Sequence, residues 1–181
     1  MVSQHSDTEG GRYGWHVDCQ ADGTFDLYRV TERGCYCKNL EFSYQYCYDI
    51  AEEVFFENRN IPPNGVIIVN DHTYISGVVN GRVSILGVQN SNRLMYIAGN
   101  ITYLDKSGDH VLGIFGRSSI FIPKNVPDIM EINAVIMNPS TYSIQRRQYS
   151  TQYADAFRSE LNVYGSLIAY YLAPPLMQGQ G

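Results

Sequence analysis

The sequence predicts a mainly β protein whose larger part is a single-stranded parallel β-solenoid. Two observations favour this class. From Val66 onward, short runs of Val, Ile and Leu alternate with Ser, Asn and Thr, which is the two-residue period of strands. Small residues also recur inside the apolar runs, at separations of 22, 17, 18 and 31 residues. These small residues are Gly77, Gly99, Gly116, Ala134 and Gly165.

A solenoid explains this recurrence because each coil lays a strand in register on the coil below. A small residue at the same place in each coil lets the chain turn a corner. The longest separation then corresponds to one coil that carries a polar insertion at 138–160. An antiparallel sandwich is the alternative, although few two-residue hairpin turns occur after Val66. Strands are expected at 66–70, 72–79, 82–87, 93–103, 110–122, 129–138 and 160–171.

A different pattern precedes the solenoid. Residues 15–30 read as a β-hairpin because two alternating runs flank Asp22-Gly23, a strong turn signal. Residues 49–58 are expected to form a short helix, with Asp49 as N-cap and Glu52 completing a capping box. We therefore expect three segments: an N-terminal hairpin and Cys/Tyr-rich cap at 1–60, the solenoid at 61–172 with its insertion, and a flexible tail at 173–181.

Composition limits the possible functions. The net charge of −5 argues against a broad electrostatic grip on nucleic acid, although Arg146 and Arg147 form one adjacent basic pair. Few charges and 15 tyrosines suit a β-rich surface that works outside the cell. No apolar run is long enough to span a membrane, so no membrane contact is expected of this chain. The N-terminus lacks the pattern of a signal peptide, and the polar ends suggest a fragment of a longer protein.

Four cysteines lie in the first quarter of the chain, and an even number there favours two disulfides. Cys35 and Cys37 flank a single residue, and alternate side chains of an extended strand point the same way, so a bond between the two is awkward. Each is therefore expected to bond either Cys19 or Cys47. Free buried thiols and a zinc site are the alternatives. The single C-x-C spacing is a poor match to the paired knuckles of structural zinc sites.

No catalytic or metal-binding motif stands out. A glycosidase needs two carboxylates across a cleft, and the solenoid part offers Asp71, Asp105, Asp109, Asp128, Glu131, Asp155 and Glu160. Acidic residues are also common in turns, where their side chains bind backbone groups. His72 and His110 each follow an aspartate, but nothing in their spacing joins them, so we interpret them as surface turn histidines. No cofactor is expected.

Tyrosines are the most suggestive candidates for binding. They crowd the Cys-rich segment and the insertion, and aromatic faces stack on sugars or bases. The alternative is that they cap an open end of the solenoid, where edge pairing must be blocked. The candidate binding residues are Tyr36, Tyr44, Tyr46, Tyr48, Tyr142, Arg146, Arg147, Tyr149 and Tyr153.

The order of phrases within residues 61–172 adds a resemblance. NGVIIV, SGVVNGRVSI, IAGNITY, DHVLGI, INAVIM and LNVYGSLI follow one another in an order that resembles the β-solenoid domain of PilX-like type IV pilus-assembly proteins and related bacterial surface proteins. The segment at 33–49 and the insertion have no counterpart there. The resemblance implies a noncatalytic, exported domain on a pilus or cell envelope. Its expected partners are other pilus or envelope subunits, and an extracellular surface, glycan or DNA. The alternative function is a carbohydrate-active β-helix enzyme, a lyase or glycosidase.

Overall fold

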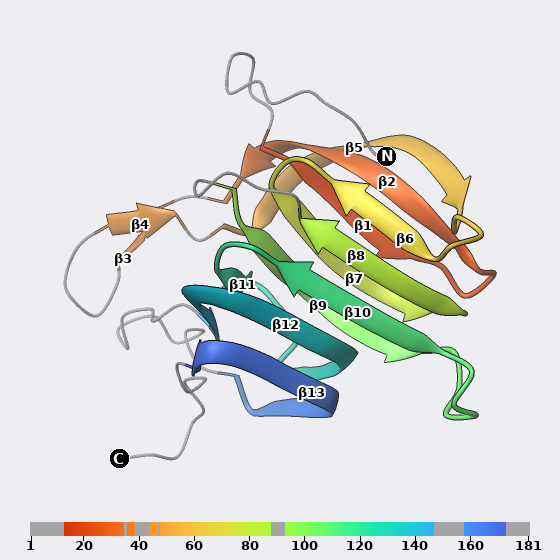
Figure 1. Ribbon diagram of the computed structural model, residues 1–181. Coiled ribbons are helices and arrows are strands. Elements are labelled where there is room, and N and C mark those ends of the chain that lie inside the picture. The colour runs from red at the N-terminus through yellow and green to blue at the C-terminus, as the bar shows by residue number, and fades with distance from the viewer. Residues whose placement is uncertain are drawn as a thin grey trace.

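The protein folds into one large β-sheet that curls on itself. The computed structural model describes residues 13–34, 36–38, 44–46, 48–87, 93–146 and 158–172. Within these ranges it gives no side-chain description for 36–38, 44–46, 139–143, 145–146 and 170–172. The described residues contain 13 strands and no helix, and 11 of the strands join the curled sheet (Figure 1). The mainly β class predicted from the sequence is confirmed.

The strands follow the chain closely from one to the next. They are β1 (Trp15–Cys19), β2 (Thr24–Arg33), β3 (Tyr36–Lys38), β4 (Tyr44–Tyr46), β5 (Ile50–Asn60), β6 (Val66–Val69), β7 (Thr73–Val79), β8 (Arg82–Gly87), β9 (Met95–Tyr103), β10 (Val111–Gly116), β11 (Ile120–Ile122), β12 (Ile129–Arg146) and β13 (Glu160–Leu172). The sheet order is β5-β2-β1-β7-β9-β11-β12-β10-β8-β6, and β13 pairs with β12 beside this path. The strands β3 and β4 form a separate two-stranded sheet.

The N-terminal hairpin forms where the sequence predicts it. The strands β1 and β2 pair antiparallel over the whole of β1. In the turn, Gly23 N donates to Gln20 O at 3.0 Å, and Gln20 N donates to Thr24 O at 2.9 Å. Gly23 has a φ of 87°, which glycine adopts without a steric penalty. Asp22-Gly23 therefore makes this turn by the chemistry that the sequence indicates.

The short helix predicted for 49–58 is wrong, because this segment is strand β5, paired antiparallel with β2. Asp49 does not cap a helix. Its Oδ1 accepts a hydrogen bond from Asn125 N at 2.6 Å, and its carbonyl accepts one from Gly34 N at 2.7 Å. Val54, Phe55 and Phe56 suit a strand once a neighbouring strand is available. Pairing with β2 therefore overrides the local helical spacing.

From β6 onward, every pairing among the described strands is parallel. One series runs from β6 through β8 and β10 to β12 and then β13. A second runs from β7 through β9 to β11, and β12 pairs with both β9 and β11. The hairpin joins this array because β1 pairs parallel with β7. The strand bounds lie close to the predicted ones, with two exceptions: 110–122 divides into β10 and β11, and the strand predicted for 129–138 continues to Arg146.

The predicted single-stranded parallel solenoid with a separate cap is corrected by this topology. The sheet is mixed, because β2 runs antiparallel to both β1 and β5, and these strands belong to the same sheet as the parallel ones. Gly77 and Gly99, expected at equivalent corners, are not register partners. Gly77 lies opposite Ile101, beyond a register shift that contains Gly99. Ala134 and Gly165 are partners.

The expected insertion at 138–160 begins as regular structure. The strand β12 continues to Arg146, and its last residues pair with β11 from Ile120 to Ile122. Residues 147–157 lie outside the described part of the chain. The polar composition of 139–146 therefore concealed a strand, because the sequence pattern offers little apolar alternation there.

The core lies between the two halves of the curled sheet. Within the core, the register of four parallel strands aligns four isoleucines: Ile67, Ile85, Ile114 and Ile136. Their side chains are at most 2% exposed. We call this row the isoleucine ladder. Burying each such side chain contributes about 1.5–3 kcal/mol relative to leaving it in water, so the ladder fixes the parallel register.

One cysteine belongs to this core. Cys19, on β1, is a free thiol and 3% exposed. Burial raises its pKa to about 12, and the nearby carboxylate of Asp18 adds to this effect. The expected disulfide from Cys19 to Cys35 or Cys37 is therefore wrong, because Cys19 faces the core beside Phe25 and Leu27. Cys35 and Cys47 lie outside the described residues, as does the side chain of Cys37.

Candidate functional site

A network of polar side chains lies on the face of the sheet opposite the core. Alternate residues of a strand point to opposite faces. Because Val17 and Cys19 face the core, His16 and Asp18 project from the other face of β1. Ser76 on β7 is the register partner of Asp18. Three strands from distant parts of the sequence thus bring polar groups together, because β5 supplies Glu53 beside these groups of β1 and β7.

The distances in this network form a continuous chain of hydrogen bonds. His16 Nδ1 lies 2.9 Å from Glu53 Oε2, and His16 Nε2 lies 2.8 Å from Ser76 Oγ. Ser76 Oγ donates to Asp18 Oδ1 at 2.5 Å. Gln20 Nε2 donates to the other carboxylate oxygen of Asp18 at 2.8 Å. The side chain of His16 is 11% exposed and that of Glu53 is 27% exposed, so the network is sheltered but reachable.

The serine, histidine and glutamate stand in the order of a nucleophile, a base and an orienting carboxylate. Asp18 changes what this order can do, because the hydroxyl of Ser76 has only one proton. When Asp18 accepts that proton, His16 Nε2 can bond Ser76 Oγ only as a donor. When the hydroxyl turns to His16, the imidazole is neutral and accepts it. The arrangement thus supports either a structural ion network or proton transfer from Ser76.

An aromatic stack occupies the same face beside this network. Tyr74, Tyr96 and Phe121 are register partners on β7, β9 and β11. The ring centroids of Tyr74 and Tyr96 are 4.5 Å apart, and those of Tyr96 and Phe121 are 6.3 Å apart. The guanidinium of Arg33 lies 5.8 Å from the Tyr96 ring centroid. Burial raises the pKa of Tyr74 to about 12, so its hydroxyl stays protonated.

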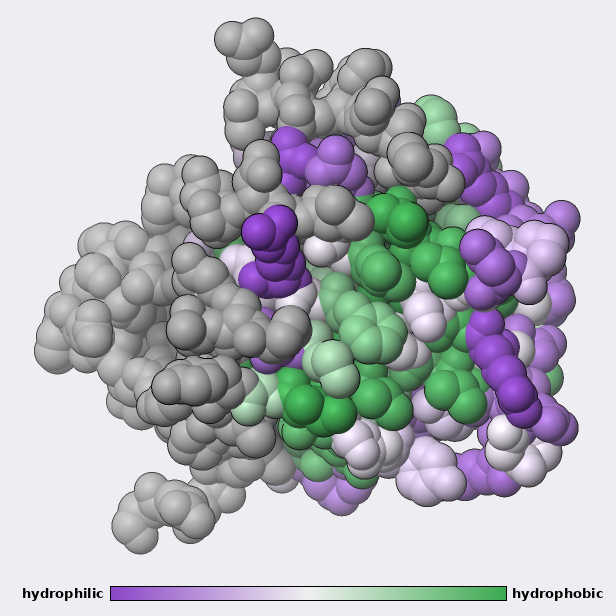
Figure 2. Space-filling view, in the orientation of Figure 1, coloured by the Kyte–Doolittle hydropathy of each residue, from purple (hydrophilic) through white to green (hydrophobic). Residues whose placement is uncertain are grey.

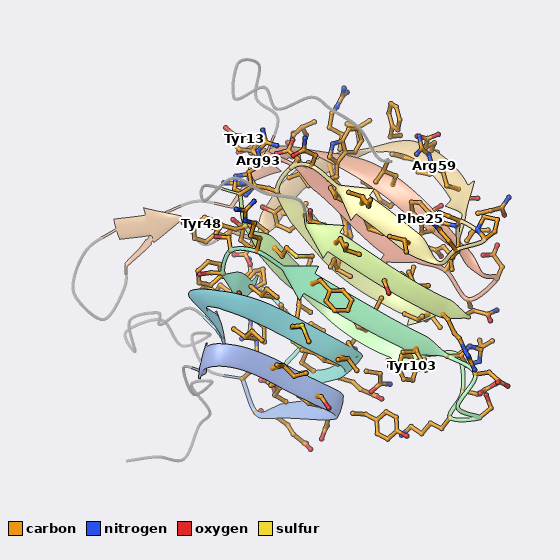
Figure 3. All side chains as sticks on the ribbon, in the orientation of Figure 1. Tyr13, Phe25, Tyr48, Arg59, Arg93 and Tyr103 are labelled. Atoms are coloured by element: carbon orange, nitrogen blue, oxygen red, sulfur yellow. The ribbon has the colours of Figure 1, made fainter. Side chains whose placement is uncertain are left out.

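Tyr48 is the one predicted binding tyrosine whose side chain is described, and it packs onto this stack. Its ring lies 5.4 Å from that of Tyr96 and 6.0 Å from that of Phe121. Figure 3 shows Tyr48 at the same end of the sheet as Tyr13. Tyr48 has a φ of 58°, a backbone conformation that costs a non-glycine residue about 1–3 kcal/mol. Stacking on two buried rings offsets this strain.

The other predicted binding residues are located by backbone only or not at all. Tyr36 pairs with Tyr46 across β3 and β4, and Tyr44 pairs with Lys38. Tyr142 and Arg146 lie in β12, away from that hairpin along the chain. Three of the predicted residues fall outside the described part of the chain: Arg147, Tyr149 and Tyr153.

The two Asp-His pairs support turns. His72 Nδ1 accepts a hydrogen bond from Leu94 N at 3.0 Å, and His110 Nδ1 accepts one from Gly81 N at 2.9 Å. Burial is the main reason that the pKa of His72 falls to about 3, so this ring is neutral. Within the described ranges, no three His, Cys, Asp or Glu side chains are placed to hold a metal ion.

Two of the acidic residues considered for glycoside hydrolysis bind backbone groups. Asp105 Oδ1 accepts a hydrogen bond from Ser107 N at 2.8 Å, and Asp128 Oδ1 accepts one from Ser159 N at 3.1 Å. Bonds to the same serines are the main reason that the pKa values of Asp105 and Asp128 fall below their usual range. The carboxylate of Asp105 therefore shapes its own turn, and that of Asp128 joins the segments that precede β12 and β13.

A second surface lies at the strand β13. Large apolar side chains are exposed on β13 and at the start of β12: Ile129 (59%), Val163 (39%), Tyr164 (57%), Leu167 (38%) and Ile168 (46%). Among the described strands, β13 pairs only with β12. Its other edge therefore presents backbone groups beside apolar side chains, which is the usual composition of a surface that pairs with another strand.

Comparisons with protein-family models, with curated proteins and with solved structures find no match to this chain. Across the residues that the structure describes, no helix is long and apolar enough to cross a membrane.

Proposed function

We propose that the chain is a noncatalytic binding module of a pilus-associated or other cell-surface protein. In this role it acts outside the cell in adhesion, in capture of DNA or glycan, or in filament assembly with other envelope subunits. The observation that carries the proposal is the exposed apolar surface of β12 and β13. Monomeric proteins rarely expose contiguous apolar patches of this kind unless they bind a partner. The tyrosine-rich, charge-poor composition and the resemblance to pilus-assembly domains support the extracellular location.

Two measurements test this function. Antibodies against the chain should label intact cells that express the full-length protein, and signal only after the cells are lysed would refute the location. Immobilised protein should bind at least one of double-stranded DNA, a glycan array or abiotic surfaces. The double variant Tyr164→Glu/Ile168→Glu should lose this binding, while Val54→Glu/Phe55→Glu, which adds the same charge to exposed sites on β5, should keep it. Absence of binding to all three ligand classes would refute capture and adhesion.

Changing the predicted tyrosines tests whether the Cys/Tyr-rich segment and the expected insertion bind a ligand. Tyr44→Ala, Tyr46→Ala, Tyr142→Ala and Tyr149→Ala remove aromatic faces from the Cys/Tyr-rich segment and from the expected insertion. If the chain binds glycan or DNA through these rings, each change should weaken binding by about 1–3 kcal/mol, the usual contribution of a stacked aromatic. Unchanged binding in every variant would remove these residues from the site.

A serine-dependent hydrolase is the second candidate function, and the Ser76–His16–Glu53 chain of hydrogen bonds favours it. In that reaction Ser76 Oγ attacks an acyl carbonyl, and His16 Nε2 takes its proton and passes it to the leaving group. Water then releases the acyl group from Ser76. The neighbouring Asp18 opposes this chemistry, because it competes for the hydroxyl proton and its charge disfavours an oxyanion.

A fluorophosphonate probe separates the two functions. Covalent labelling of Ser76, lost in Ser76→Ala and strongly reduced in Glu53→Gln, would establish the enzyme. Labelling that matches the Ser76→Ala background would leave the network a structural one. The carbohydrate-active alternative has less support. The one buried carboxylate among the described residues, Asp49, binds backbone groups, and a glycosidase needs two carboxylates.

A further inference from the structure

The isoleucine ladder ends at an open rung. Ile67, Ile85, Ile114 and Ile136 are buried, and the register continues from Ile136 to Leu167 on β13. Leu167 is 38% exposed although it occupies the same core-facing position. Its exposure follows from its place at the end of the row, since no described strand lies beyond β13. A further strand beside β13 would complete the burial of this rung.

The outer face of the same strands carries a second apolar row. Ile68, Leu86, Phe115, Met137 and Ile168 are register partners on the series from β6 to β13. Figure 2 shows hydrophobic residues gathered in the middle of this face, with hydrophilic residues at its rim. Each face of β13 therefore carries apolar side chains, and a strand that extends the sheet there would gain contacts on both sides.

Charge distinguishes the edge at β13 from the edge at β5. Over its eleven residues β5 carries Glu52, Glu53, Glu57 and Arg59. Charged residues on an edge strand block pairing with other chains. The thirteen residues of β13 include a single charged residue, Glu160, at the first position. Two copies of a chain with a net charge of −5 repel each other. A contact through β13 reduces this repulsion because the strand itself carries little charge.

We propose that β13 pairs antiparallel with β13 of a second copy of this chain, related by a two-fold axis through Ser166. This inference rests on the proposed function, of which it names the partner. An antiparallel pair centred on Ser166 places Tyr164 opposite the second copy's Ile168 on the outer face. On the core face it places Gly165 opposite Leu167, so the missing side chain of glycine leaves room for the exposed leucine.

The same register also suits the other side chains of β13. Core-facing residues meet core-facing residues, so the open rung at Leu167 is covered without burying polar side chains. The two Glu160 carboxylates lie at opposite ends of the paired stretch, where they remain in water. The two-fold arrangement is self-complementary, as a closed dimer requires. A parallel pairing of two copies would instead bring like residues together and leave a further edge open.

Sedimentation velocity over a range of protein concentrations tests the dimer. We expect a dimer in the wild-type chain and an increase in its dissociation constant of about 10- to 100-fold in Tyr164→Lys/Ile168→Lys, since two exposed anchors become cations at a shared axis. Val54→Lys/Phe55→Lys is the matched control and should leave the dissociation constant unchanged. Far-UV circular dichroism should show the same fold in both variants, because all four side chains are exposed.

A cysteine scan tests the register. Two residues that face each other on the axis lie within disulfide distance, so Ser166→Cys should form a covalent dimer under mild oxidation, beyond the level of the parent chain. Asn162→Cys should not, because its copies lie far from the axis. A monomer at every concentration would overturn the proposal, including the case in which residues 173–181 of the same chain cover the edge. A dimer that resists the β13 lysines, or that fails to cross-link through Ser166→Cys, would also overturn it. Ligand binding by such a monomer would still support the proposed function, so the two failures are distinguishable.

Discussion

Replacing Gly77 with alanine tests the closest approach between two strands of the sheet. Gly77 lies in β7 with a φ of 104°, a conformation that side chains rarely adopt. A Cβ atom there would lie 2.2 Å from the carbonyl oxygen of Cys19 and 2.6 Å from its nitrogen. Both contacts are to backbone, so β1 must move away from β7. Strain at such a φ costs about 1–3 kcal/mol, and loosened pairing adds to it. We expect Gly77→Ala to lower the free energy of unfolding by about 3 kcal/mol or more.

Two other glycines provide matched controls for the two parts of this cost. Gly81 has a φ of 116°, but a Cβ there meets nothing within 4 Å. Gly81→Ala should therefore cost only the backbone strain, about 1–2 kcal/mol. Gly99 has no positive φ, and its Cβ would make an ordinary contact of 3.4 Å with Ser76. Gly99→Ala should change the free energy of unfolding by less than about 0.5 kcal/mol, since it also restricts the unfolded chain.

Urea titrations measure this series directly. The single tryptophan, Trp15, lies in β1, the strand that is expected to move, and its fluorescence reports unfolding. Midpoints compared at a constant slope give the differences in unfolding free energy. A Gly77→Ala value within about 0.5 kcal/mol of the Gly81→Ala value would refute the reasoning, because it would mean that β1 and β7 are not in close backbone contact at Gly77.

Three further predictions concern the core and two buried titratable groups. Ile85→Ala should cost about 2–5 kcal/mol in urea unfolding because Ile85 is fully buried, and a loss as small as that of exposed Val111→Ala would contradict the isoleucine ladder. Cys19 should resist maleimide at pH 8 in the folded chain, and rapid modification would show that the thiol is accessible. The free energy of unfolding should fall as pH rises from about 9 toward 12, because only the unfolded chain loses the thiol proton in this range. His72 is neutral when folded, with a pKa of about 3, so stability should fall between pH 6.5 and 3 by up to about 1.4 kcal/mol per pH unit. His72→Asn should remove that slope, and an unchanged slope would assign it to other groups.

The sequence predicts the strands well and their arrangement less well. Alternating apolar residues identify β6 to β9 within about two residues, because a half-buried strand in either a solenoid or a curled sheet needs the same two-residue period. Asp22-Gly23 identifies the hairpin because turn chemistry is local. The strand β5 was missed because Ile50, Val54 and Phe55 also have helical spacing. Pairing with β2, which comes from a different part of the sequence, decides between a helix and a strand for residues 49–58.

The mixed topology depends on contacts that a local pattern does not encode. Nothing in residues 15–30 indicates that β1 pairs parallel with β7, whose residues lie nearly sixty positions later. This pairing places Cys19 in the core opposite Gly77, and the expected disulfide fails for that reason. An even number of cysteines is weak evidence for disulfides, because Cys19 packs beside Phe25 in the core as a free thiol.

The polar network around His16 cannot be recognised in the sequence, because it also depends on contacts between distant residues. His16 lies 37 residues from Glu53 and 60 from Ser76, and none of the three belongs to a local motif. Glu53 had been assigned to a helix, where it could not reach His16. Tyr48 has a packing role that the local pattern does not reveal, although its neighbourhood of tyrosines predicts a binding ring. The structure uses it to cover Tyr96 and Phe121.

The two candidate surfaces are far enough apart for their tests to be independent. The polar network belongs to β1, β5 and β7, whereas the apolar edge belongs to β13. The strands β9 and β12 lie between β7 and β13, a distance of about 14 Å at about 4.8 Å per strand. Lysines at Tyr164 and Ile168 should therefore leave labelling of Ser76 unchanged, and Ser76→Ala should leave the dimer intact. If both changes instead altered both properties, the sheet would have to transmit the effect, and the assignment of separate roles to the two surfaces would be wrong.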